Sequence, residues 1–221
     1  MAFPPVLPAP AMVATSLLPA LQPLLALLDM AGVAVFAVSG ALAAAKSKQT
    51  IVTFAFFAVV TGIGGGTLRD LLIGAPVFWV GRSDYLGICL VAAGAVWLLR
   101  ADRWQLNALL WFDAIGMAAY AVIGAAKALG YGVPALPAIV MGVLTASFGG
   151  IIRDVLAAQP SVLLRREIYI SAAALGAATF VLLSEAGLGP WPAGLVGAAA
   201  GFTLRALAIG RGLTLPGYRD D

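Results

Sequence analysis

The chain has 221 residues, of which 62% are hydrophobic and only 10% are charged, and its formal net charge is +3. A soluble domain has about 45–50% apolar and about 25% charged residues, so this composition excludes an ordinary soluble protein and indicates one dissolved in a bilayer. The small, scattered positive charge speaks against a nucleic-acid partner. The chain has no histidine and a single cysteine, Cys89, so we expect no zinc or haem site and no cofactor.

Residues 1–23 are rich in proline and carry no charge. We expect a lead-in segment there rather than a secretory signal, which would need a basic start. Seven apolar runs follow, each near the length that a helix needs to cross about 30 Å of hydrocarbon. The runs are residues 24–45, 51–73, 83–99, 107–129, 134–157, 168–184 and 190–209. The sequence therefore predicts an all-α membrane protein with seven transmembrane helices and a short tail over 210–221.

The basic residues between these runs are distributed unequally over the two faces of the membrane. With seven spans, one face carries Lys46, Lys48, Arg100, Arg103, Arg165, Arg166, Arg205, Arg211 and Arg219. The other face carries Arg82 and Lys127. Because cytoplasmic loops carry an excess of Lys and Arg, this bias predicts a cytoplasmic C-terminus and an N-terminus outside.

The chain contains an internal repeat. Residues 29–100 align without a gap with residues 113–184, and 21 of the 72 positions are identical. The matches include Asp29/Asp113, Gly32/Gly116, Gly40/Gly124, Thr61/Thr145, Gly65/Gly149, Gly66/Gly150, Arg69/Arg153, Asp70/Asp154, Pro76/Pro160, Arg82/Arg166 and Tyr85/Tyr169. Each copy holds three spans, so the second copy enters the membrane from the opposite face, an arrangement typical of membrane transport proteins. We expect a three-helix repeat over 24–100, a second, inverted one over 107–186, and a seventh helix over 190–209.

Two glycine-rich stretches, TGIGGGTLRD at 61–70 and TASFGGIIRD at 145–154, occupy equivalent places in the second and fifth spans. Glycine costs a helix about 1 kcal/mol relative to alanine. Unwound backbone at membrane depth is tolerated only where it is buried in protein or lines a water-filled cavity. The stretches therefore indicate kinked helices that line a path, with close helix packing through small residues as the alternative. The expected path residues are Thr61, Gly64, Gly65, Gly66, Arg69, Asp70, Thr145, Ser147, Gly149, Gly150, Arg153 and Asp154.

Charged residues inside the spans cost at least about 2.5–3.5 kcal/mol each at a helix centre, so we expect them to face the protein interior and to pair. The expected cross-helix pairs are Asp29–Arg69 near one face and Asp113–Arg153 near the other. Asp70 and Asp154 are left to face water at the two mouths of the path. The alternative is that all six side chains only hold helices together.

Lys127 has no counterpart in the first copy, because its repeat mate is Ala43. A lone lysine at this depth is either an anchor whose ammonium reaches the interface or a charge in the path, on which the membrane voltage acts.

These features resemble the prokaryotic branch of the trimeric intracellular cation channels, sequences also long labelled glycine transporters. The likeness covers about residues 24–209 and is carried by the inverted triplets with GGGTLRD and FGGIIRD in the second and fifth spans. It implies a homotrimer in the inner membrane of a prokaryote, surrounded by membrane lipids, with a pore in each subunit that passes monovalent cations, chiefly potassium. The motif positions are Gly65, Gly66, Arg69, Asp70, Gly149, Gly150, Arg153 and Asp154. The tail after residue 209 lacks the long basic extension of animal members.

Two functions of different classes stay open. The first is a passive cation channel, and the second is a secondary transporter of a small solute such as glycine, in which Asp29 and Asp113 would serve for coupling. An enzyme is not expected, because Ser147 has no evident base and the chain has no histidine. For the oligomer, we expect glycines to allow close helix approach, namely Gly32, Gly40, Gly116 and Gly124.

Overall fold

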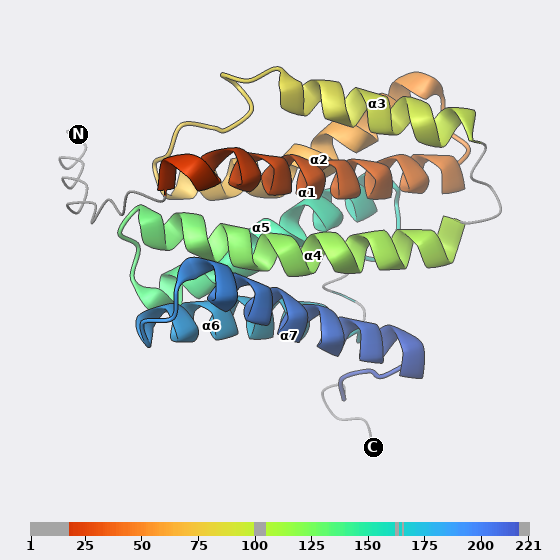
Figure 1. The fold of residues 1–221 in the computed structure, drawn as a ribbon. Coiled ribbons are helices and arrows are strands. Elements are labelled where there is room, and N and C mark those ends of the chain that lie inside the picture. The colour runs from red at the N-terminus through yellow and green to blue at the C-terminus, as the bar shows by residue number, and fades with distance from the viewer. Residues whose placement is uncertain (1–17, 100–104, 162–163, 165, 217–221) are drawn as a thin grey trace, which may run out of the picture.

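The computed structural model describes residues 18–99, 105–161, 164 and 166–216, and these residues form seven α-helices. The helices are α1 (Leu18–Lys46), α2 (Ile51–Leu72), α3 (Asp84–Leu98), α4 (Gln105–Gly130), α5 (Ala135–Leu156), α6 (Ile170–Glu185) and α7 (Pro190–Arg211). They pack lengthwise into one bundle, so that α1 begins at one end of it and α7 ends at the other (Figure 1).

The predicted spans agree closely with the helices. Each boundary lies within two residues of the prediction, except that α1 begins at Leu18 and not at residue 24. Of the lead-in predicted at 1–23, residues 1–17 lie outside the described residues, and residues 18–23 belong to α1. Among the described helices, five are long and apolar enough to cross a membrane, while α3 and α6 have only 15 and 16 residues. At 1.5 Å per residue, each of these two is about 22–24 Å long and falls short of the hydrocarbon thickness.

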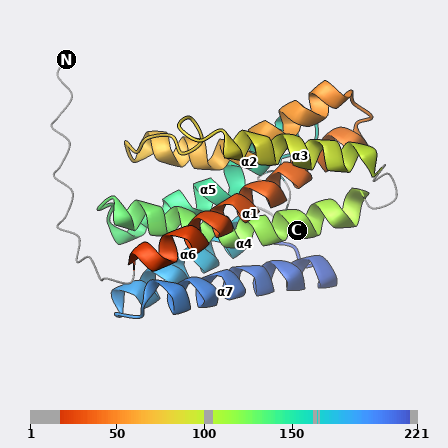
Figure 2. The ribbon, with the colours of Figure 1, turned by 45° about the horizontal axis from the view of Figure 1, so that its top comes forward.

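The two halves of the repeat have the same helix contacts. α1 packs on α2 and α3 as α4 packs on α5 and α6, and α2 contacts α3 as α5 contacts α6. The halves meet where α1 packs on α4 and α2 packs on α5 (Figure 2). α7 has no counterpart and packs on α4 and α6 of the second half.

Glycines let α1 and α2, and equally α4 and α5, approach closely. A Cβ atom on Gly40 would stand 2.6 Å from Thr61 Oγ1. In the second half, a Cβ atom on Gly124 would stand 2.7 Å from the Cβ of Thr145. Neither site has room for a side chain, so both glycines are needed for packing within the chain.

The other pair of repeat-matched glycines lies between the halves. A Cβ atom on Gly116 would stand 3.0 Å from Cε2 of Phe36, and one on Gly32 would overlap the ring of Tyr120. The prediction that the four glycines serve contacts between subunits is therefore wrong, because all four are buried inside the bundle.

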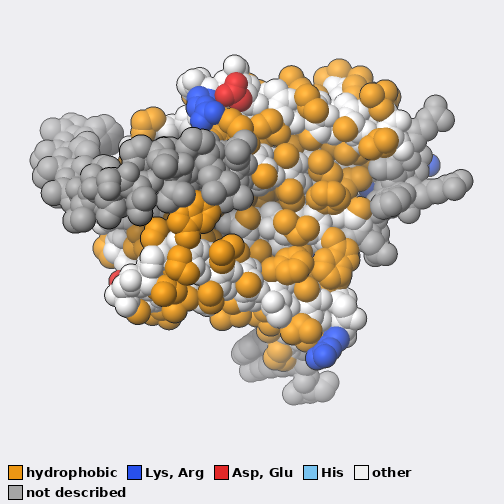
Figure 3. Space-filling model, in the orientation of Figure 1, with side chains coloured by type: hydrophobic (Ala, Val, Ile, Leu, Met, Phe, Trp, Pro, Cys, Tyr) orange, Lys and Arg blue, Asp and Glu red, His pale blue; other side chains and the backbone are white. Residues whose placement is uncertain are grey.

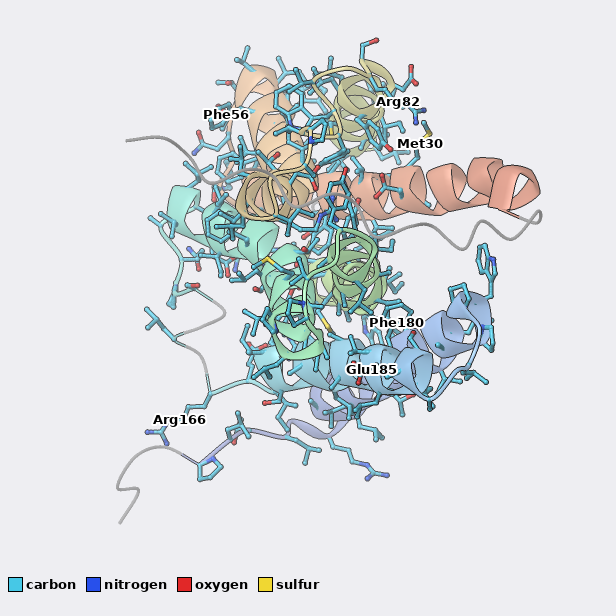
Figure 4. All side chains as sticks on the ribbon, turned by 90° about the vertical axis from the view of Figure 1, so that its left-hand side faces the viewer. Met30, Phe56, Arg82, Arg166, Phe180 and Glu185 are labelled. Carbon is cyan, nitrogen blue, oxygen red and sulfur yellow. The ribbon has the colours of Figure 1, made fainter. Side chains whose placement is uncertain are left out.

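The outer surface of the bundle is apolar. The face in Figure 3 is covered mainly by hydrophobic side chains, and its few charged side chains lie near the edges. Figure 4, in which the left-hand side of Figure 1 faces the viewer, shows Phe56 at the periphery and Phe180 among the helices. Their exposed fractions are 54% and 4%. Large apolar residues exposed along several helices suit a surface in contact with lipid.

Candidate functional site

α2 and α5 carry the same short polar pattern on one helical face. Thr61, Gly65 and Arg69 are spaced four residues apart, which places them one above another on α2. Their repeat mates are Thr145, Gly149 and Arg153 on α5. All six residues are buried, so both patterned faces point into the bundle, where α2 and α5 pack against each other.

The two helices cross at the glycines of this pattern. A Cβ atom on Gly65 would overlap the carbonyl oxygen of Thr145, and one on Gly149 would overlap the carbonyl oxygen of Thr61. The same glycine-to-carbonyl contact therefore occurs twice, between residues at equivalent positions of the two repeats. Only glycine permits backbones to approach this closely.

The helices do not unwind at the glycines, and the bend predicted at Gly64–Gly66 and Gly149–Gly150 stays a prediction. Both helices run without interruption, α2 through Gly64–Gly66 and α5 through Gly149–Gly150. Gly66 faces the ring of Phe78, because a Cβ atom there would stand 2.7 Å from Cε1 of that ring. Gly64 is less crowded, with Cδ1 of Ile152 at 3.1 Å from such an atom. The alternative of close packing describes the crossing.

A group of buried polar side chains, here named the α5 cluster, lies at the C-terminal end of α5. Its members are Asp113, Arg153, Asp154, Ser39 and Tyr169. Arg153 Nη1 lies 2.7 Å from Asp113 Oδ1, and Arg153 Nη2 lies 2.8 Å from Asp154 Oδ1. Arg153 Nη1 also donates to the hydroxyl of Ser39. One guanidinium is therefore shared between two carboxylates, and the side chains of all three residues are at most 8% exposed.

The corresponding group at the C-terminal end of α2, the α2 cluster, pairs differently. Its members are Asp29, Arg69, Asp70, Tyr85, Tyr120 and Lys127. Asp70 Oδ1 lies 2.7 Å from Arg69 Nη2 and 2.8 Å from Lys127 Nζ, so one carboxylate holds two cations. The other oxygen of Asp70 accepts a hydrogen bond of 3.0 Å from the Phe78 amide.

Asp29 is held by two tyrosines. The hydroxyl of Tyr85 donates to Asp29 Oδ2 at 2.7 Å. The hydroxyl of Tyr120 lies 3.1 Å from the Asp29 carbonyl oxygen and 3.4 Å from Asp29 Oδ1. Both tyrosines are buried, with exposed fractions of 4% and 3%.

The predicted pairings are thus right in one half only. The pair Asp113–Arg153 is present, whereas Asp29 pairs with tyrosines in place of Arg69. Asp70 and Asp154 do not face water, because they are 0% and 5% exposed and each is paired with the arginine before it. Burial of a carboxylate at membrane depth requires such a partner.

The three hydroxyl groups predicted to line the path differ in their hydrogen bonding. Thr145 and Ser147 donate to backbone carbonyls one turn earlier, those of Met141 and Val143, at 2.6 and 2.7 Å. Thr61 Oγ1 is buried and has no hydrogen-bond partner in the described part of the chain.

The sequence did not single out several polar residues of these groups. Tyr85 and Tyr169 appeared only as matched positions of the repeat. Arg205 is one of the basic residues expected on the C-terminal face, but it lies in α7, is 4% exposed and donates to Glu167. Its guanidinium also stands 5.2 Å from the ring centre of Tyr169, which supports the α5 cluster from the side of α7. The position of Arg205 within an otherwise apolar run could have indicated a buried, paired arginine.

Replacing Lys127 by methionine is expected to lower the free energy of unfolding by about 1–3 kcal/mol. Asp70 would lose one of its two cations but keep Arg69 and the Phe78 amide. Thermal unfolding in detergent measures the change, with Lys46→Met at an exposed helix end as the control. Equal melting temperatures for the two variants would show that the Lys127–Asp70 contact contributes nothing.

No group of three or more His, Cys, Asp or Glu side chains is placed to hold a metal ion among the described residues. Both clusters are built from ion pairs and hydroxyl groups.

The fold and the two clusters define a seven-helix membrane protein with an inverted repeat and buried charges in both halves. A family model described as "Glycine transporter" matches residues 26–101 and again residues 110–185. The chain belongs to this family. The double match confirms the internal repeat.

Curated relatives cover most of the chain. A UPF0126 membrane protein of Vibrio cholerae is 42% identical over 198 residues, which are 88% of this chain and 83% of that protein. The UPF0126 inner membrane protein YadS of Escherichia coli K12 is 41% identical over 155 residues, which are 67% of this chain and 73% of that protein. The chain is accordingly an integral membrane protein.

Solved structures share the fold. The trimeric intracellular cation (TRIC) channel orthologue from Rhodobacter sphaeroides is 45% identical, with a TM-score of 0.84, over 87% of this chain and 100% of that one. A prokaryotic TRIC channel studied in 0.5 M KCl is 26% identical, with a TM-score of 0.80, over 88% of this chain and 100% of that one. The resemblance to prokaryotic TRIC channels is thereby confirmed. These relatives are channels, in agreement with the expectation that the chain is not an enzyme.

Proposed function

We propose that the chain is a cation channel, with potassium as its chief permeant ion and one path in each subunit beside the α2–α5 crossing. The observation that carries this proposal is the pair of buried charge clusters, one at each end of that crossing. Ionisable residues inside a membrane protein usually mark an ion path, because their burial is costly and a purely structural role is filled more easily by apolar residues. The likeness to the Rhodobacter sphaeroides channel supports it.

The charges of the clusters favour cations over anions. In the α5 cluster, two carboxylates surround one guanidinium, so its formal charge is negative. In the α2 cluster, Asp29 and Asp70 balance Arg69 and Lys127. A neutralised arginine offers no barrier to a passing cation, whereas a bare one would repel it by about 4 kcal/mol at 4 Å and an effective dielectric constant of 20.

The path runs beside the crossing and not through it, because the backbones of α2 and α5 touch at Gly65 and Gly149. Thr61 Oγ1 is a buried oxygen next to this contact and lacks a partner in the described part of the chain. A hydroxyl oxygen at this place can replace a water of the ion's hydration shell. The same path would include Gly64, Gly66, Thr145, Ser147 and Gly150 on the adjoining turns.

We further propose a homotrimer whose subunits meet through their apolar outer faces. The Rhodobacter sphaeroides relative is described as trimeric. The excess of basic residues in the segments expected on one face of the membrane supports a C-terminus in the cytoplasm. The relative YadS supports the inner membrane as the location.

The second candidate is a glycine transporter, which the description of the family model favours. Proteoliposomes separate the two functions. A channel gives potassium flux that follows the potassium gradient and is unaffected by glycine. A carrier gives saturable uptake of labelled glycine without independent potassium flux, and that result would overturn the channel proposal.

A further inference from the structure

The two halves carry the same Arg-Asp motif yet pair it differently. In the α5 cluster, Nη1 of Arg153 binds Asp113. Arg69 is the repeat mate of Arg153, and its Nη1 is buried with no hydrogen-bond partner in the described part of the chain. The mate of Asp113 is Asp29, which accepts from tyrosines instead. A vacant buried donor costs free energy, so something must hold Asp29 away from it.

The difference between the halves is encoded at three positions on one face of α1 and α4. On α1 the residues are Phe36, Ser39 and Ala43, and their mates on α4 are Tyr120, Ile123 and Lys127. The spacing of three and four residues puts each triplet on a single helical face. At the α5 cluster, the hydroxyl of Ser39 accepts from Arg153, and Ala43 stands at the position that corresponds to Lys127. At the α2 cluster, the corresponding residue Ile123 has no side-chain oxygen that could accept from Arg69.

Position 36 and its mate 120 differ by one hydroxyl group. The rings of Phe36 and Tyr120 pack on each other with centres 5.4 Å apart. The hydroxyl group of Tyr120 lies 3.1 Å from the Asp29 carbonyl oxygen and 3.4 Å from Asp29 Oδ1, and both Asp29 and Arg69 are close enough to act on Tyr120 electrostatically. Phe36 has no such group, and Asp113 is paired with Arg153.

We infer that Tyr120 is a positioning residue, whose hydroxyl group holds Asp29 away from Arg69 and thereby sets the pairing of the whole α2 cluster. The α5 cluster shows the arrangement that Asp29 and Arg69 adopt once this hydroxyl group is removed. The pairing itself is independent of the proposed function, and only its effect on conduction rests on that function.

The test is a double-mutant cycle between Asp29 and Arg69 in two backgrounds. Asp29→Asn, Arg69→Gln and the double variant are made in the wild-type chain and in Tyr120→Phe, and melting temperatures are measured in detergent. In the wild-type background we expect the two changes to add, because the side chains are not paired. In the Tyr120→Phe background we expect them to deviate from additivity by about 2–4 °C, because a new ion pair is lost.

The opposite substitution at the repeat-matched position, Phe36→Tyr, provides a second, independent test. Phe36→Tyr introduces the hydroxyl group beside Asp113, and the non-additivity between Asp113→Asn and Arg153→Gln should shrink. Equal coupling of Asp29 and Arg69 in both backgrounds would overturn the inference, since the tyrosine would then act through packing alone. If Tyr120→Phe does not fold, the Phe36→Tyr arm decides, and unchanged coupling there overturns the inference.

Conduction is measured on the same variants in planar bilayers. If Tyr120→Phe creates the coupling between Asp29 and Arg69 and also changes the unitary potassium current, both the positioning role of Tyr120 and a path beside the α2 cluster are supported. Should the coupling appear without any change in a potassium current that the wild type carries, the positioning role stands and the α2 cluster is not part of the path. A wild type without current would contradict the proposed function alone.

Discussion

Replacing Arg153 by glutamine is expected to lower the free energy of unfolding by about 3–5 kcal/mol, which is the largest effect of a single substitution in either cluster. The guanidinium is the shared partner of Asp113 and Asp154, and its loss removes an ion pair from two buried carboxylates. A membrane protein with the usual margin of about 5–15 kcal/mol would then give much less folded material. Thermal unfolding and the yield of monodisperse protein in detergent measure the loss.

Arg82→Gln is the matched control for this substitution. Arg82 pairs with Asp84 at 3.2 Å, but their side chains are 46% and 60% exposed. An exposed ion pair of this kind contributes about 0–1 kcal/mol. Combining Arg153→Gln with Asp113→Asn should recover part of the loss, because one of the two carboxylates that lose the guanidinium is then neutral. A melting temperature of Arg153→Gln equal to that of Arg82→Gln would contradict the role given to the α5 cluster.

Replacing Gly65 by alanine is expected to lower the free energy of unfolding by about 2 kcal/mol, the difference between a severe overpacking cost and the helix propensity that alanine regains. The new Cβ atom would overlap the carbonyl oxygen of Thr145, and a backbone atom cannot rotate away as a side chain can. Overpacking costs typically about 1–3 kcal/mol and sometimes more, while alanine regains about 1 kcal/mol of helix propensity. Gly149→Ala should behave likewise, because its Cβ atom would overlap the carbonyl oxygen of Thr61.

The neighbouring glycine provides the control. At Gly64 a Cβ atom would stand 3.1 Å from Cδ1 of Ile152, the flexible end of a side chain, so Gly64→Ala should be neutral or stabilise by up to about 1 kcal/mol. Melting temperatures in detergent distinguish the two positions. Equal values for Gly64→Ala and Gly65→Ala would show that the helices do not cross in contact at Gly65.

The helices and the repeat could be predicted from the sequence because both depend on local information. Apolar runs have the length of a membrane span, and the repeat is visible in matched residues such as Asp70 and Asp154. The pair Asp113–Arg153 followed from the rule that buried charges find partners.

The partners of Asp29 and Arg69 in the first half could not be predicted in the same way. The repeat suggests that Asp29 and Arg69 pair as their mates do, but Asp29 contacts Tyr120 and Asp70 contacts Lys127. Both Tyr120 and Lys127 lie on another helix and differ from their mates. Likewise, glycine permits both unwinding and close approach. Only the position of Thr145 relative to Gly65 decides between them, and that position is a property of the packed bundle.

Recording from the purified protein in a planar bilayer under a potassium chloride gradient tests the central claim most directly. Unitary current steps that reverse near the equilibrium potential of potassium, and not that of chloride, are the predicted result. Absence of steps together with gradient-driven glycine uptake, or a reversal near the chloride potential, would contradict a cation path beside the α2–α5 crossing.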